Sequence, residues 1–198
     1  MGGGADEAAA RAPVFVEVHG VRVAFLARVA TPREAGGFSI DEWAAGPTSA
    51  GLAVGDPATL AADVTAARQS ADVVIVLLHA GDEYQHQPNA TQRALAEAAL
   101  AAGADAVIGA HPHVVQPIEQ RGAQLVAWSL GNFVFDLDEV DRANIPPPRV
   151  TLVLRLTFAA GRGLVGYQVV PMTLDEAEGR PRPATDEETA MLASQVAP

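Results

Sequence analysis

Residues 71–113 read ADVVIVLLHAGDEYQHQPNATQRALAEAALAAGADAVIGAHPH. Two apolar runs, 71–78 and 106–109, flank residues 91–102, where leucine and alanine recur at helical spacing. Strand, helix and strand in this order form a βαβ unit, and its right-handed crossover makes the two strands parallel. We therefore predict an α/β fold in which both strands end at the same edge of a sheet.

Histidines follow both predicted strands. His79 closes the first strand, and His111 and His113 follow the second as a His-Pro-His tripeptide. Ligand sites in open α/β sheets lie outside the carboxyl ends of the strands, and neutral imidazole is the commonest metal ligand. Three histidines at this edge could form a mononuclear site, while a structural His pair that bonds the local backbone is the alternative.

The loop after His79 carries further polar candidates. Asp82 and Glu83 could support a ligand, contact a substrate or simply be solvated. Tyr84 and His86 lie in the same loop, and loops of this kind often carry ligand contacts. Their spacing alone does not choose among these roles.

A hairpin and a helix are predicted before the βαβ unit. Residues 14–18 and 21–27 are β-rich runs separated by a two-residue turn, in which His19 should face solvent. Residues 31–57 form a long loop with a short turn near 40–44, and an Asp-Pro pair then starts a helix that reaches residue 69.

A third strand and a second hairpin are predicted after the unit. The β-run at residues 124–129 ends shortly before Asn132, which could donate a hydrogen bond in the site or belong to an ordinary turn. Residues 150–158 and 164–170 read as an antiparallel hairpin, and the proline-rich segment at 144–148 reads as a loop.

Composition limits the function classes. With 198 residues, 49% of them hydrophobic and 19% charged, we expect one globular domain over residues 13–172 and an acidic, Pro-rich, weakly structured tail over 173–198. The net charge of −11 argues against a nucleic-acid surface. No apolar run approaches the ~20 residues of a transmembrane segment. Because cysteine is absent, metal ligands must be imidazole, carboxylate, amide or water.

Four motifs together carry a family resemblance. They are DVVIVLLHAGDEY (72–84), Gln92 in the following helix, GADAVIGAHPHVVQPIE (103–119) and WSLGNFVFD (128–136). In this order they resemble the C-terminal half of the bacterial poly-γ-glutamate capsule-synthesis proteins of the CapA type, a branch of the calcineurin-like metallophosphoesterases. The resemblance extends from about Pro13 through Pro171.

The resemblance implies a four-layer α/β/β/α metallophosphoesterase-like sandwich with a dinuclear centre of divalent ions, Mn, Zn or Fe. By position, His79 and His111 would bind one ion and His113 the other. We take Glu83 and Asn132 as the candidate catalytic residues of that centre.

The sequence departs from the family pattern in two ways. Ala80 and Ala110 stand where many relatives have Trp and another His. The upstream acidic and Asn-His motifs do not occur between Met1 and Ala71, so the carboxylate expected to bridge ions ~3.5–4 Å apart is missing. The resemblance thus implies a truncated or split form, the C-terminal portion of the domain.

Two functions follow as expectations. The first is a role in poly-γ-glutamate capsule or cell-envelope polymer biosynthesis, through metal-assisted hydrolysis or transfer on an anionic polymer or phosphoester. The alternative is a non-catalytic envelope module that binds a polymer or a partner. A partner chain that supplies the missing half, or a second copy, could complete the centre. The family also implies a location on the extracellular side of the bacterial cell envelope.

Overall fold

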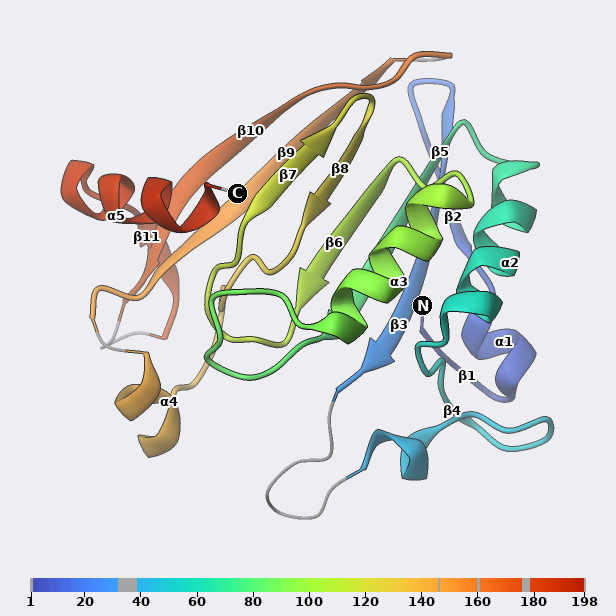
Figure 1. Cartoon of the computed structure of the whole chain (residues 1–198), viewed down its shortest axis with the longest axis horizontal. Helices are drawn as coiled ribbons and strands as arrows, with labels where there is room; N and C mark the ends of the chain where they lie inside the picture. The colour runs from blue at the N-terminus through green and yellow to red at the C-terminus, as the bar shows by residue number, and fades with distance from the viewer. Residues whose placement is uncertain (1, 32–38, 146, 160, 176–178, 198) are drawn as a thin grey trace.

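A six-stranded sheet forms the centre of the fold (Figure 1). The computed structural model describes residues 2–31, 39–145, 147–159, 161–175 and 179–197. The strand order is β2 (Val14–Val18), β3 (Val21–Ala30), β5 (Val73–Ala80), β6 (Ala106–Ala110), β8 (Gln124–Ala127) and β7 (Ile118–Arg121). The four inner strands run parallel, and β2 and β7 are antiparallel edges. The predicted parallel α/β sheet is confirmed.

Helices α2 (Pro57–Arg68) and α3 (Ala90–Ala101) cover one face of this sheet (Figure 1). The Asp56 side chain caps α2 by accepting the N–H of Thr59, as the Asp-Pro start predicts. Both helices bury apolar side chains against β3, β5 and β6, in a core that includes Leu26, Leu60, Val76, Leu95 and Val107. The predicted crossover helix is therefore present at its expected place.

A three-stranded sheet packs on the opposite face. It consists of β9 (Val150–Ala159), β10 (Gly163–Leu174) and β11 (Pro181–Pro183), and the β9–β10 pair is the predicted hairpin. Leu156 and Phe158 of β9 contact the cluster formed by Ile75 and Ala106 of the main sheet. The molecule is thus a mixed α/β fold with a mostly parallel central sheet, helices on one side and a second sheet on the other.

The C-terminal region predicted as a weakly structured tail contains regular elements. β11 pairs with β10, and α5 (Asp186–Val196) begins with a capping box formed by Thr185 and Glu188. Arg182 and Glu188 form an ion pair at 2.8 Å, and this partner lowers the pKa of the Glu188 carboxyl to about 2. Leu192 of α5 is 1% exposed in a cluster shared by both sheets, so burial of this side chain holds α5 against them.

Several short elements do not appear in the sequence prediction. They are β1 (Gly3–Gly4), α1 (Glu7–Arg11), β4 (Gly51–Leu52) and α4 (Glu139–Asn144). The turn expected near residues 40–44 is the 3-10 helix η1 (Ile40–Trp43), while residues 32–38 of the predicted long loop lie outside the described part. Among the described residues, no helix has the length and apolarity that crossing a bilayer requires.

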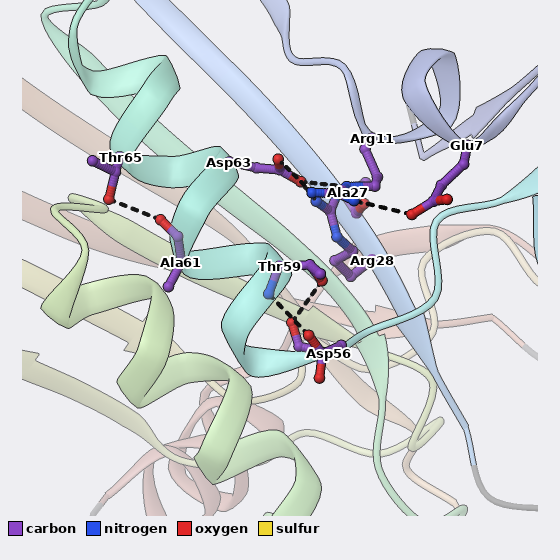
Figure 2. Close-up of polar contacts among 9 residues, drawn as sticks. All are labelled: Glu7, Arg11, Ala27, Arg28, Asp56, Thr59, Ala61, Asp63 and Thr65. Atoms are coloured by element: carbon purple, nitrogen blue, oxygen red, sulfur yellow. Dashed lines mark hydrogen bonds and ion pairs between the residues drawn. The ribbon is translucent and has the colours of Figure 1, made fainter. Parts of the chain in front are cut away.

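An arginine pair ties the N-terminal elements to the sheet. Figure 2 shows Arg11 of α1 and Arg28 of β3 meeting Asp63 of α2. Arg11 binds both carboxylate oxygens at 2.9 Å, and Arg28 contacts the same carboxylate from a fully buried position. Burial lowers the pKa of the Arg28 guanidinium, and Asp63 opposes that effect. One carboxylate therefore compensates a buried cation and links three elements.

Candidate functional site

The ends of β5 and β6 bring two histidines together. His79 is the penultimate residue of β5 and lies beside Ala110, the last residue of β6, so His111 follows directly at the same sheet edge. The ring centroids of His79 and His111 are 4.9 Å apart. The ring of His113 lies farther away, at 6.3 Å from that of His111.

The loop that carries His111 and His113 has an unusual backbone. The φ angles are 104° at His111 and 63° at His113, a region that side chains other than glycine rarely adopt. Just before them, a Cβ atom on Gly109 would lie 1.8 Å from the Trp128 carbonyl oxygen, so only glycine permits this approach of β6 to β8. Strain of this kind costs of the order of 1–3 kcal/mol and often marks functional sites.

Two buried glutamines hold the loops around the site. Gln92 is 2% exposed and donates to the side-chain oxygen of Gln116 at 2.9 Å and to the Trp128 carbonyl at 3.2 Å. Gln116 is fully buried and donates to the Gln85 carbonyl at 2.8 Å. The network therefore fastens the loop after β5 to the segment after His113.

His111 is electrostatically suited to remain neutral. Burial is the main cause that lowers its pKa to about 4, with smaller contributions from His79 and His113. The nearby Asp82 carboxylate has the opposite effect and raises the pKa of His111. The Nε2 atom of His111 is buried and has no hydrogen-bond partner in the described part of the chain. A neutral imidazole with an unused ring nitrogen is the form that binds a metal ion.

His113 lies between two carboxylates. Its Nε2 atom is 3.8 Å from Oε1 of Glu83, and its Nδ1 atom is 3.7 Å from Oδ1 of Asp141. The Tyr84 hydroxyl donates to the same Asp141 oxygen at 3.1 Å. Burial and this hydrogen bond raise the pKa of Tyr84. The Phe135 ring meets the His113 ring edge-on at 4.8 Å.

The other candidates occupy separate positions. Nδ1 of His86 lies 3.1 Å from the Val115 carbonyl oxygen, which it can bind only as a donor. His19 is exposed in the β2–β3 turn, as predicted. Asn132 is half-buried, and its Nδ2 atom has no hydrogen-bond partner among the described residues. Its backbone neighbours Gly131 and Phe133 line the cavity that His79 borders.

That cavity has a volume of about 660 Å³ and opens between the main sheet and β9. Its walls are mainly apolar and include Leu77, Ile108, Leu130, Leu152 and Leu154 beside His79. Apolar walls favour an apolar occupant over an anionic one. The cavity is therefore better suited to a packed protein segment than to a charged polymer.

The described residues alone do not enclose a metal ion. No group of three or more His, Asp or Glu side chains among them has the spacing of a metal site. Two of them could still contribute ligands to such an ion. The rings of His79 and His111 lie next to each other, and Nε2 of His111 has no hydrogen-bond partner among the described residues. The remaining ligands would have to come from elsewhere or from a rearrangement of the loop.

Sequence reasoning did not single out Asp141 or Gln116. Gln116 could have been noticed as a polar residue within the apolar run VVQPI. Asp141 gave no such signal. It lies in the six-residue helix α4, which is too short to show a periodic pattern and which borders a segment predicted as a loop. Only the tertiary fold brings α4 to His113.

Similarity to known proteins was found in both sequence and structure. The family model described as "Bacterial capsule synthesis protein PGA_cap" matches residues 1–137. The PGA biosynthesis protein CapA of Bacillus subtilis is 40% identical over 122 residues, covering 62% of this chain and 30% of the relative. The capsule biosynthesis protein CapA of Bacillus anthracis is 33% identical over 184 residues, which cover 87% of this chain and 39% of that relative. The chain thus spans less than half the length of these relatives.

A solved structure supports the fold assignment. A hypothetical protein from Thermus thermophilus superposes with a TM-score of 0.51 and 16% identity, over 81% of this chain and 61% of that one. At this identity the likeness concerns the fold alone.

Proposed function

The chain belongs to the PGA_cap family of bacterial capsule synthesis proteins, and from this premise we propose that it acts in poly-γ-glutamate capsule or envelope-polymer assembly. The names of its CapA relatives support this role. The substrate would be an anionic polymer or phosphoester, processed by metal-assisted hydrolysis or transfer. We further propose that the two sheets form part of a four-layer metallophosphoesterase-like sandwich, in which residues 13–172 correspond to the C-terminal portion of the domain. The extracellular side of the envelope is the proposed location.

We propose that His79 and His111 hold one divalent ion, Mn, Zn or Fe, and that His113 holds a second. The observation that carries this proposal is the adjacent pair of His79 and His111 rings, with an unpartnered, buried Nε2 on His111. The larger separation of His113 supports its assignment to the other ion. When bound, such ions supply Lewis acidity and a water whose pKa is lowered to ~7.

Glu83 and Asn132 are the residues that we propose to act on the substrate. Glu83 is exposed and lies near Nε2 of His113, where it could accept a proton. The amide of Asn132 has a buried, unpartnered Nδ2 that could donate to a substrate oxygen.

A partner chain, or a second copy of this one, would complete the centre. Two features support this step: the apolar cavity beside His79 and the exposed edge strand β2. Unpaired strand edges and apolar cavities are natural places for another segment to pack. Such a segment could also supply the carboxylate that bridges two ions.

Metal titration tests the proposal. Calorimetry with Mn²⁺ and Zn²⁺ should show binding to the purified chain that is weakened at least about tenfold by His111→Ala/His113→Ala. His19→Ala is the matched control, because this exposed histidine lies in the β2–β3 turn. Absent binding, or equal affinity in the double variant, would contradict the proposed metal centre.

A non-catalytic binding module is the second candidate. The absence of a three-ligand group among the described residues favours it. Hydrolysis of bis-p-nitrophenyl phosphate with Mn²⁺ separates the two functions. Turnover that requires both the metal and His111 supports the enzyme, whereas metal binding without turnover supports the binding module.

A further inference from the structure

Asp141 is a buried carboxylate whose role the proposed function does not use. It is 5% exposed and lies in the six-residue helix α4, far in sequence from the strands that carry the histidines. Burying a carboxylate is unfavourable unless it accepts hydrogen bonds or meets a cation. The groups that contact the Asp141 carboxylate therefore indicate its role.

Both oxygens of Asp141 are engaged. Oδ2 accepts the backbone N–H of Asp138 at 3.2 Å, which completes the capping box of α4. Oδ1 accepts the Tyr84 hydroxyl at 3.1 Å and lies 3.7 Å from Nδ1 of His113. The capping box accounts for one oxygen, and the other faces the candidate metal centre.

Nδ1 of His113 has no other group to satisfy it. The atom is buried and has no hydrogen-bond partner in the described part of the chain. At 3.7 Å from Oδ1 it is beyond a normal hydrogen bond, yet close enough for the carboxylate to attract an N–H group at this nitrogen. The Glu83 carboxylate lies 3.8 Å from Nε2 on the other side of the ring, but its side chain is 43% exposed and so is screened by water, whereas that of Asp141 is 7% exposed. The buried Asp141 oxygen therefore favours the tautomer that carries its proton on Nδ1, and such contacts often shorten when a ligand binds.

Neighbouring residues pack against the His113 ring and hold its carboxylate partner in place. Phe135 packs edge-on against its ring at 4.8 Å. Tyr84, which orients Asp141, is itself held by a backbone hydrogen bond from its N–H to the Pro112 carbonyl at 2.8 Å. The His113 imidazole is thus surrounded by three connected segments, which are the loop after β5, the helix α4 and the His-Pro-His segment.

We propose that Asp141 is a positioning residue that keeps the proton of His113 on Nδ1 and so leaves Nε2, on the side of Glu83, as the ligand atom. This inference rests on the proposed metal-binding function. Metal-ligating histidines commonly donate their second ring N–H to a carboxylate, which fixes the tautomer and orientation of the ring. Here Tyr84 would fix the carboxylate in turn.

The test compares Asp141→Ala with Asp138→Ala. Both changes break the capping box of α4, but only the first removes the carboxylate beside His113. Nitrogen NMR of the metal-free protein at a pH where histidine is neutral reports the tautomer directly. We expect His113 to be Nδ1-protonated in the parent and in Asp138→Ala, and to shift towards Nε2–H by roughly threefold or more in Asp141→Ala. If Asp141→Ala does not fold, the near-isosteric Asp141→Asn replaces it.

Zinc titration of the same variants gives a second readout. We expect Asp141→Ala to weaken Zn²⁺ binding by about tenfold or more and Asp138→Ala to change it far less. An unchanged tautomer in Asp141→Ala overturns the positioning role, even if the parent binds zinc as proposed. Absence of zinc binding in the parent overturns the metal centre instead, and the tautomer measurement then still decides whether Asp141 orients His113.

Discussion

His111 combines backbone strain with a buried, unpartnered ring nitrogen. Its φ of 104° and its depressed pKa, about 4, are both unfavourable for a residue with only a structural role. Gly109 before it makes the close approach of β6 to β8 possible. A residue held in this way against its local preferences is a good candidate for a functional one.

Acid should destabilise the metal-free protein through His111. Because its folded-state pKa of about 4 lies below the ordinary value of ~6.5, the unfolded chain binds more protons between these pH values. The stabilising contribution is complete above pH ~6.5 and is lost as the pH falls through about 4. Between pH 7 and 4, we expect the unfolding free energy to fall about 2 kcal/mol more than in His111→Asn, by urea denaturation with EDTA. Equal losses in both proteins would contradict this.

Asp63 links elements rather than serving the histidine site. It binds Arg11 of α1 and the fully buried Arg28 of β3 from its place on α2 (Figure 2). The contacts explain how the short helix α1 stays attached to the sheet. They also leave Arg28 dependent on a single counter-charge among the described residues.

Removing that charge should be costly. We expect Asp63→Asn to lower the unfolding free energy by about 3 kcal/mol, because it leaves the Arg28 guanidinium buried without a counter-charge. Asp56→Asn on the same helix is the control, since asparagine caps helices as well as aspartate. The double change Arg28→Met/Asp63→Leu should recover most of the loss. Chemical denaturation measures all four proteins, and a double variant no more stable than Asp63→Asn would contradict the pairing.

At the scale of the whole molecule, the edge strand β2 is unusually exposed. All five residues of β2 are exposed, with Val16 at 44%, and no strand pairs with its outer edge among the described residues. Natural sheets usually protect such edges with charge or cover. This exposure agrees with the proposal that another chain or copy completes the domain.

Self-association should therefore depend on β2. We expect the purified chain to associate as its concentration rises, and Val16→Lys to reduce this by placing a charge on the edge strand. Val165→Lys is a matched control, because this valine of β10 is 46% exposed on the second sheet. Sedimentation velocity compares the three proteins. Equal association in all of them would argue against β2 as the contact.

Local pattern was sufficient for most of the longer elements, although not for α5. The apolar strands β5 and β6, the capped helices α2 and α3 and both hairpins follow from periodicity, turn residues and caps, which act within a few positions of the chain. Short elements such as α1 and α4 could not be predicted from local pattern. Helices of this length have a weak helix propensity of their own, and tertiary contacts stabilise them.

The sequence by itself determined the parallel α/β core and the placement of His79, His111 and His113 at the ends of two of its strands, because strand periodicity and crossover handedness are local rules. Only the tertiary structure decided which side chains surround them. Asp141 reaches His113 and Gln92 meets Gln116 because packing joins segments that are 28 and 24 residues apart, and no local pattern encodes such distances.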